Sequence, residues 1–269
     1  MNIDARLLEE LRLLAERAGG EVMAVYATDF AAVAKDDQSP LTEADLRADA
    51  VIRAGLAQLC PGVPVVSEES LPEIPPPEDQ PYFLVDPLDG TKEFVARTGE
   101  FTVNVALVLR GEVLAGVVHA PALGETFFAA AGQGAWRRDA RGSRPIRVAR
   151  YDRAAPLRIV GSRSHGGARL AAWVDALAVQ REFSPAGSSL KFCRVAEGVA
   201  DLYPRLGPTC LWDTAAAQCV LEQAGGRVTD LAGVSLRYRP TPGWLNPEFV
   251  AFSDAACLAL CEPLRPRNA

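Results

Sequence analysis

The spacing of apolar residues predicts a chain that mixes helices with short buried strands. Leucine, alanine and valine recur every three or four positions over residues 4–27, which predicts an amphipathic helix. A second helical pattern begins at Thr42 and ends before Pro61-Gly62. Two compact apolar runs, 63–66 and 82–85, have the length of buried strands, and acidic residues follow both of them.

The rest of the pattern indicates two halves of different character. Alternating apolar residues over 102–118, interrupted by one turn, predict a β-hairpin. Strand and helix patterns alternate in the last part of the chain, which is typical of an α/β unit. The basic, turn-rich stretch 137–156 separates the two patterns. We therefore expect an N-terminal α+β half over 1–150 and a C-terminal α/β half over 151–269.

The most informative stretch is Asp86-Pro87-Leu88-Asp89-Gly90-Thr91, directly after the apolar run 82–85. Pro87 has no amide hydrogen to donate, so we expect the strand to end there. Two carboxylates, with the carbonyl of Leu88 between them, are the hard oxygen ligands that suit Mg²⁺. The amides of Gly90 and Thr91 come next, and amides at the start of a helix bind anions. These features together indicate phosphoryl chemistry, and the alternative is an ordinary surface turn.

Three other acidic positions offer further ligands, each with a simpler alternative. Glu68 follows the 63–66 strand and could share an ion with Asp86 if the two strands are neighbours; alone, it would belong to a solvated loop. Asp45 falls at the third position of a predicted helix, where a capping-box acid stands. Asp213 lies at or beside another helix start, where an acid also stabilises the helix dipole.

Composition narrows the partners and cofactors. The chain has 269 residues, a net charge of −6 and a pI of about 5.1, which argues against nucleic acid as a partner. The six cysteines form no C-x-x-C pair, which argues against zinc and favours reduced core cysteines of a cytoplasmic protein. We see no secretory signal and no apolar run long enough to span a membrane. His119, at the end of a predicted strand, fits a structural residue better than a ligand.

Taken in order, the acidic motifs resemble those of the magnesium-dependent, lithium-sensitive phosphatase superfamily that includes the inositol monophosphatases and fructose-1,6-bisphosphatases. The matching segments are Ser39-Pro40-Leu41-Thr42-Glu43-Ala44-Asp45, Ser67-Glu68-Glu69, Asp86-Pro87-Leu88-Asp89-Gly90-Thr91 and Trp212-Asp213-Thr214-Ala215-Ala216. They cover nearly the whole chain. The resemblance implies an α/β (α+β) fold layered as an αβαβα sandwich, with the metal ions between the two halves.

The resemblance also implies how the acids divide two or three Mg²⁺ ions. The first ion would be held by Glu68, Asp86 and the carbonyl of Leu88. The second would be held by Asp86, Asp89 and Asp213, and a third, weaker ion would need Glu68. Two such ions can clamp the attacking and leaving oxygens of an in-line displacement, and phosphoryl transfer asks mainly for positioning and charge neutralisation.

By the same resemblance, Asp45 and Thr91 are the pair that orients and deprotonates the attacking water. Glu68 completes the catalytic set. No histidine is needed for this chemistry, which fits a chain with only two histidines.

Two further segments resemble the bacterial 3′(2′),5′-bisphosphate nucleotidase branch of this superfamily. They are Gly187-Ser188-Ser189-Leu190-Lys191-Phe192 and Tyr203-Pro204-Arg205-Leu206-Gly207-Pro208-Thr209. The resemblance implies that Ser188, Lys191 and Arg205 face the nucleotide and its second phosphate, with His165 near the base and Gly90 and Thr91 at the reacting phosphate. Ordinary helix and loop charges are the alternative for Lys191 and Arg205.

These inferences predict a phosphatase that removes the 3′-phosphate of adenosine 3′,5′-bisphosphate, with its sulfated analogue as a further candidate substrate. One alternative is an inositol or sugar monophosphatase. Another is a non-catalytic sensor of phosphorylated ligands, although a sensor would not need both Asp45 and Thr91. We expect a cytoplasmic monomer or homodimer without an integral membrane segment. Peripheral attachment at the cytoplasmic face of the inner membrane is left open.

Overall fold

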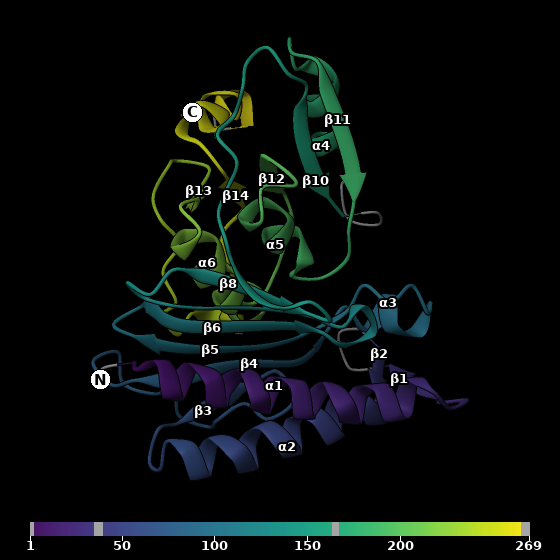
Figure 1. Cartoon of the computed structure of the whole chain (residues 1–269), viewed down its shortest axis with the longest axis vertical. Coiled ribbons are helices and arrows are strands. Elements are labelled where there is room, and N and C mark those ends of the chain that lie inside the picture. The colour runs from purple at the N-terminus through teal and green to yellow at the C-terminus, as the bar shows by residue number, and fades with distance from the viewer. Residues whose placement is uncertain (1–2, 35–39, 163–166, 265–269) are drawn as a thin grey trace.

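Helices and sheets alternate in five layers, in the order α, β, α, β, α (Figure 1). The computed structural model describes residues 3–34, 40–162 and 167–264. The helices are α1 (Ala5–Tyr26), α2 (Glu43–Leu59), α3 (Thr91–Val95), α4 (Gly167–Ala176), α5 (Leu190–Ala196), α6 (Ala215–Gln223) and α7 (Ala255–Ala259), with 3₁₀ turns η1 (Pro121–Leu123), η2 (Leu211–Asp213), η3 (Pro242–Trp244) and η4 (Glu262–Leu264). Helices α1 and α2 form one outer layer, α5 and α6 the middle layer, and α4 and α7 the other outer layer. The expected αβαβα sandwich is therefore confirmed.

The larger sheet has seven strands and lies between α1/α2 and α5/α6 (Figure 1). Its strands, in spatial order, are β3 (Val65–Ser67), β4 (Tyr82–Asp89), β5 (Thr102–Leu109), β6 (Glu112–Ala120), β7 (Glu125–Ala130), β8 (Ala135–Asp139) and β9 (Gly142–Ile146). Strands β3 and β4 are parallel, and Ser67 pairs with Val85. The acidic segments at the carboxyl ends of these two strands therefore lie side by side.

The smaller sheet has five strands, in the order β11 (Arg181–Pro185), β10 (Leu157–Gly161), β12 (Leu202–Arg205), β14 (Phe249–Phe252) and β13 (Arg227–Asp230). The chain passes from the larger to the smaller sheet between residues 146 and 157. A two-stranded ribbon, β1 (Ala32–Ala34) with β2 (Pro40–Thr42), precedes α2. Within the described ranges, no helix combines the length and apolar character needed to cross a membrane.

The prediction that the strand ends at Pro87 is wrong. Strand β4 continues to Asp89, with a shift of register against β5 between Asp86 and Asp89. Its other neighbour, β3, has already ended at Ser67 opposite Val85, so no ladder bond from Pro87 is needed on that side. The irregularity turns the backbone locally, as β-bulges do, and so re-aims the two aspartates.

Helix caps and one close approach fix the outer helices α1 and α2. Thr42 and Asp45 form the predicted capping box at the start of α2. The Gly19-Gly20 pair interrupts the apolar pattern of α1, and the imidazole of His119 packs against Gly19 so tightly that a Cβ there would lie 2.4 Å from its ring. The Nδ1 atom of His119 is 2.9 Å from the hydroxyl of Thr126, and burial lowers the pKa of the imidazole. His119 is thus a buried structural residue.

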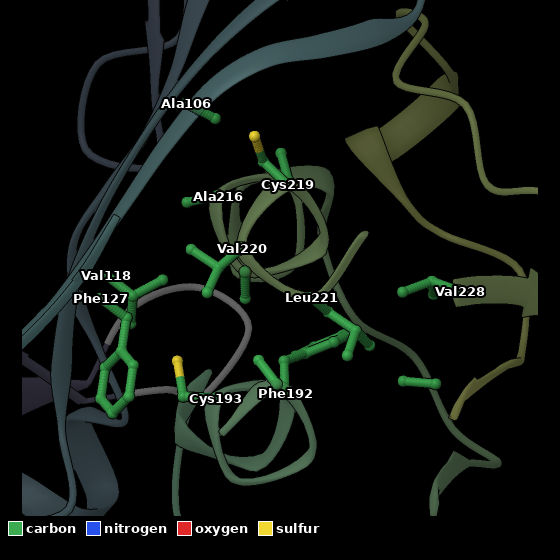
Figure 2. Close-up of a cluster of buried hydrophobic side chains, with 14 of the residues drawn as sticks. Ala106, Val118, Phe127, Phe192, Cys193, Ala216, Cys219, Val220, Leu221 and Val228 are labelled. Atoms are coloured by element: carbon green, nitrogen blue, oxygen red, sulfur yellow. The ribbon is translucent and has the colours of Figure 1, made fainter. Parts of the chain in front are cut away.

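Helix α6 is the centre of the main core. Its apolar residues face the larger sheet on one side and α5 on the other, as Figure 2 shows for Ala216, Cys219 and Val220. Gly116 on β6 lets the helix approach closely, because a Cβ there would lie 2.3 Å from the carbonyl oxygen of Ala216. The close packing against β6 therefore fixes the distance of α6, which begins after Asp213, from the larger sheet.

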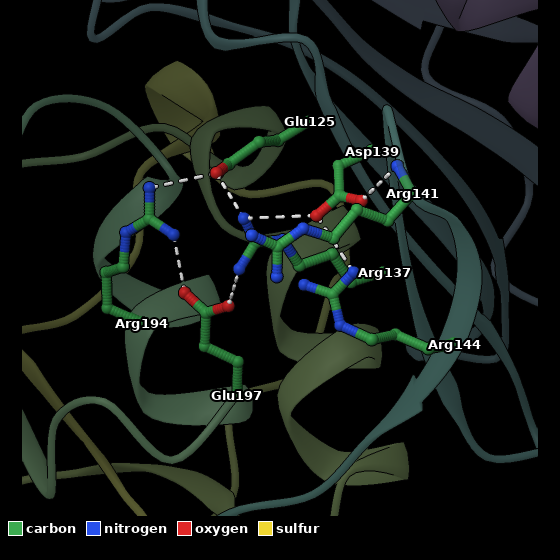
Figure 3. A network of polar contacts seen from close by, with 7 residues as sticks. All are labelled: Glu125, Arg137, Asp139, Arg141, Arg144, Arg194 and Glu197. Carbon is green, nitrogen blue, oxygen red and sulfur yellow. Dashed lines mark hydrogen bonds and ion pairs between the residues drawn. The ribbon is translucent and has the colours of Figure 1, made fainter.

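An ion network fastens α5 to the larger sheet (Figure 3). The guanidinium of Arg194 lies 2.5 Å from Glu197 and 3.0 Å from Glu125. Arg137 on β8 pairs with Glu125 and lies 2.5 Å from Glu197. The Glu197 side chain is only 6% exposed, so removal of one partner would leave a buried charge uncompensated. The network therefore fixes the C-terminal end of α5.

Gly116→Ala should destabilise the protein by about 1–3 kcal/mol, because the added methyl group overpacks the contact between β6 and α6. Gly20→Ala is the matched control, since nothing lies within 4 Å of a Cβ at Gly20 in α1. It should stabilise the helix by about 0.5–1 kcal/mol. Urea unfolding of both variants measures the two free energies, and equal effects would contradict the packing account.

Candidate active site

A cavity of about 280 Å³ lies between the two sheets, where the acidic segments meet the N-terminal ends of α5 and α6. It contains most of the residues that the sequence singled out. The lining residues are Glu68, Asp86, Leu88, Asp89, Gly90, Thr91, Lys92, Glu93, Ser162, Ser188, Lys191, Phe192, Tyr203, Arg205, Thr209, Cys210, Trp212, Asp213 and Thr214. Both halves of the chain therefore contribute to one site.

Three carboxylates converge in this cavity. One oxygen from each of Glu68, Asp86 and Asp213 lies within 4.8 Å of the other two. Burial raises the pKa of Asp86 well above its usual value, and the charges of Glu68, Asp89 and Asp213 raise it further. Burial and the charge of Asp89 likewise raise the pKa of Asp213. Like charges held this close in a buried place are unfavourable, so the cluster fits a divalent cation with oxygen ligands.

Asp89 lies beside this cluster but is oriented by a different set of contacts. Its Oδ2 atom accepts hydrogen bonds from the backbone amide of Ser189 (2.6 Å) and from the Ser189 hydroxyl (2.8 Å). Thr102 and Asn104 donate to the same oxygen at 3.4 Å each. The carboxylate is thus held by the neighbouring strand β5 and by the residue that precedes α5.

Asp45 does not line the cavity but contacts Thr91, which does. The Thr91 hydroxyl lies 3.5 Å from Asp45 Oδ1 and 3.2 Å from the carbonyl of Leu88. Asp45 Oδ2 accepts from the amide and hydroxyl of Thr42, so the capping alternative also holds for this residue. One carboxylate oxygen therefore caps α2, and the other faces Thr91.

Asp213 likewise has two roles. Its Oδ2 accepts a hydrogen bond from the amide of Cys210 at 2.8 Å, which caps η2. Asn246 holds the residues on either side of η2. Its side-chain amide donates to the carbonyl of Cys210 (2.7 Å) and to the hydroxyl of Thr214 (3.0 Å). The turn that carries Asp213 is therefore fixed from both sides.

Most residues expected to bind substrate line the cavity and come from both halves of the chain. Gly90, with φ +89°, precedes α3 and faces Ser188 across a narrow gap. Ser188 also has positive φ, +44°, and its buried hydroxyl has no hydrogen-bond partner among the described residues. Arg205 donates to the carbonyl of Pro208, and its buried Nε has no partner within the same ranges. His165 lies outside the described residues.

Lys191 is more deeply placed than a phosphate ligand at a cavity mouth would be. Its Nζ donates to the carbonyl of Ser188 at 2.5 Å and lies 5.5 Å from the ring centre of Tyr203. Burial lowers the pKa of this amine to about 8, although Asp89 and other acids favour its charged form. In this structure Lys191 fixes the turn that carries Ser188.

The sequence did not single out Ser189, Asn104 or Asn246. Each holds a segment that carries a candidate ligand, and none has a motif of its own. Ser189 had one usable signal, because it stands beside Ser188 in the resembling segment. Asn104 and Asn246 have no such signal in the sequence, because only the fold brings their side-chain amides to the site.

The sequence model of the inositol monophosphatase family matches residues 5–254. The 3′(2′),5′-bisphosphate nucleotidase CysQ of Escherichia coli K12 is 46% identical over 246 residues, which cover 90% of this chain and 98% of that protein. The nucleotidase of the same name from Haemophilus influenzae is 33% identical over 260 residues, 94% of this chain and 95% of that protein.

Solved structures agree with the sequence comparison. The crystal structure of CysQ from Bacteroides thetaiotaomicron superposes with a TM-score of 0.77 at 33% identity, over 90% of this chain and 96% of that chain. The extragenic suppressor protein suhB from Bartonella henselae superposes with a TM-score of 0.81 at 25% identity, over 96% of this chain and 98% of that chain. Sequence, fold and the order of the acidic motifs therefore agree, and the chain belongs to the inositol monophosphatase family.

Proposed function

We propose that this protein is a magnesium-dependent 3′(2′),5′-bisphosphate nucleotidase that hydrolyses the 3′-phosphate of adenosine 3′,5′-bisphosphate to AMP and phosphate. The observation that carries the proposal is one cavity lined by both acids and cations. Glu68, Asp86 and Asp213 converge in it, and Lys191 and Arg205 line the same cavity. The family membership and the names of the relatives support a phosphatase with a nucleotide bisphosphate as its substrate.

We infer two Mg²⁺ ions and a third, weaker ion that would need Glu68. Glu68, Asp86 and the carbonyl of Leu88 would hold the first ion, and Asp86, Asp89 and Asp213 would hold the second. The close approach of Glu68, Asp86 and Asp213 supports a divalent ion at this place. When bound, Mg²⁺ supplies charge neutralisation at the phosphate and makes water more acidic. An acidic protein can bind a highly charged anion in this way because the ions reverse the local charge.

The chain's own residues orient the reacting groups. Asp45 Oδ1 is the carboxylate oxygen that faces the Thr91 hydroxyl. Thr91 could pass its proton to this oxygen while it takes one from the attacking water, once substrate tightens the 3.5 Å contact. The carbonyl of Leu88 competes for the same hydroxyl hydrogen. Gly90 and Thr91 line the cavity, and the reacting phosphate would bind there beside the acids.

Arg205 reads the phosphate that is not transferred. Its guanidinium has a planar fork that suits phosphate oxygens, and its buried Nε awaits an acceptor. Lys191 contributes charge and holds the Ser188 turn in place. The Ser188 hydroxyl, likewise without an acceptor in the described ranges, would bond to the substrate.

Thr91→Ala should lower kcat by about 10²–10⁴-fold with little change in KM, if Thr91 takes part only as the water attacks. Thr98→Ala is the control: it removes an exposed threonine seven positions later that donates only to the carbonyl of Glu93. Steady-state phosphate release measures both. An increase in KM with kcat unchanged would instead assign Thr91 to ground-state binding of the phosphate.

The substrate assignment is tested by a ratio: kcat/KM for adenosine 3′,5′-bisphosphate over kcat/KM for inositol 1-phosphate. The wild type should favour the bisphosphate and lose activity in EDTA. Arg205→Gln should lower the rate for the bisphosphate about ten- to a hundredfold, since a charge-assisted hydrogen bond contributes about 1.5–3 kcal/mol and each 1.4 kcal/mol is tenfold. Arg205→Glu should lower it further by repulsion.

The monophosphate serves as the internal control in this experiment. It has no second phosphate for Arg205 to bind, so its rate should stay level or rise in both variants. A ratio that does not change with the charge at position 205 would mean that Arg205 does not read the substrate. Preference of the wild type for inositol 1-phosphate would favour the sugar monophosphatase alternative.

A further inference from the structure

Ser189 joins the two halves of the protein at the metal site. It is 1% exposed and stands at the end of the turn before α5. Its amide donates to Asp89 Oδ2 at 2.6 Å, and its hydroxyl oxygen lies 2.8 Å from the same oxygen. The hydroxyl also lies 2.6 Å from the backbone carbonyl of Asp213. One serine therefore contacts a candidate ligand residue from each half.

The usual role of a serine at this place does not explain these contacts. Ser189 is the N-cap residue of α5, yet its side chain makes no capping hydrogen bond to that helix. It has αR backbone angles (φ −66°, ψ −8°) instead of the extended conformation typical of an N-cap serine. The hydroxyl is turned away from α5 and towards Asp89 and Asp213.

The hydroxyl of Ser189 has one hydrogen and its amide another, and these two limit how Ser189 can hold the Asp89 carboxylate. The hydroxyl of Ser189 accepts from Asn104 Nδ2 at 2.9 Å and has one hydrogen to donate, either to Asp89 or to the Asp213 carbonyl. In both cases the Ser189 amide continues to bind Asp89 Oδ2. All donors found for this carboxylate in the described residues meet Oδ2, which leaves Oδ1 for a cation.

The position of Ser189 is itself fixed by the rest of α5. The ion network of Figure 3 holds the far end of the helix, through Arg194 and Glu197, against Glu125 and Arg137 of the larger sheet. The near end is held by the amide bond of Ser189 to Asp89, and the Ser189 hydroxyl bonds to Asp89 or to the carbonyl of Asp213. A helix held at both ends cannot shift without moving the carboxylate.

We propose that Ser189 is a positioning residue for the metal site, which fixes Asp89 so that only its Oδ1 is presented to the cation. Through Asp213 the same hydroxyl couples the two halves of the protein to metal binding. The inference rests on the proposed magnesium-dependent function. Partners that orient a metal ligand in this way typically change metal affinity by about 10–100-fold when they are removed.

The test is Mg²⁺ binding to the full chain without substrate, measured by calorimetry, with Mn²⁺ binding by electron paramagnetic resonance as a second probe. Ser189→Ala should weaken the affinity by about tenfold or more. Ser188→Ala is the matched control: it removes a neighbouring hydroxyl that has no partner in the described residues, and should leave the Mg²⁺ affinity unchanged. At saturating Mg²⁺, Ser189→Ala should recover most of the wild-type kcat.

A double-mutant cycle tests whether Ser189 acts through Asp89. In the Asp89→Asn background, Ser189→Ala should weaken Mg²⁺ binding by much less than in the wild type, because residues that share one contact are not additive. Thermal unfolding in EDTA checks that each variant is folded. If Ser189→Ala does not fold, Ser189→Cys, which keeps a weak donor, should give an intermediate loss of affinity.

The possible failures are distinguishable. Wild-type protein that binds no Mg²⁺ would overturn the proposed function and this inference with it. Wild type and Ser189→Ala with equal Mg²⁺ affinity would overturn this inference alone. Equal losses in Ser188→Ala and Ser189→Ala, or additive losses in the cycle with Asp89→Asn, would show that the Asp89 contact is not the cause.

Discussion

Repulsion between closely spaced carboxylates is the constraint on which the rest of the structure depends. Glu68, Asp86 and Asp213 each bring an oxygen within 4.8 Å of the others; Asp86 is buried and the other two are half-buried, which limits the water that could screen them. The pKa values of Asp86 and Asp213 are raised for this reason. A chain free to relax would move these groups apart, so the surrounding fold must hold them in place.

The fold holds them from several directions. Glu68 follows β3 and Asp86 lies within the parallel strand β4, and Asp213 precedes α6, which Gly116 allows to lie close against β6. Tyr82 on β4 donates to the carbonyl of Tyr238 at 2.7 Å, which ties the larger sheet to the C-terminal half. The ion network at α5 and the Ser189 contacts add two more connections between the halves. The acids thus belong to different segments whose relative position is fixed by packing elsewhere.

Much of the layered fold and of the acid set could be predicted from the sequence. The helix from residue 4, the hairpin after residue 102 and the Thr42–Asp45 cap each depend on local spacing or chemistry, and the structure has them. The end of the strand at Pro87 was predicted wrongly, because the rule against proline assumes a neighbour on both sides, and β3 stops before reaching it.

The contacts made across the chain could not be predicted. Ser189 lies one hundred residues from Asp89, and Asn246 more than thirty from Cys210 and Thr214. Nothing in the local pattern marks such side chains, because their role arises only when two sheets and a helix meet. The same holds for Lys191, whose motif points to the substrate while its amine bonds to a carbonyl of its own turn.

The fold holds these carboxylates together before any cation binds. Proton release upon Mg²⁺ binding tests this most directly. A carboxyl with a raised pKa keeps its proton above the usual pH near 4 and must lose it to bind metal. Calorimetry in buffers of different ionisation enthalpy counts these protons. The account predicts release upon Mg²⁺ binding that falls towards zero as pH rises through the raised pKa values of Asp86 and Asp213. Binding with no proton release at any pH above the usual carboxyl value near 4 would contradict it.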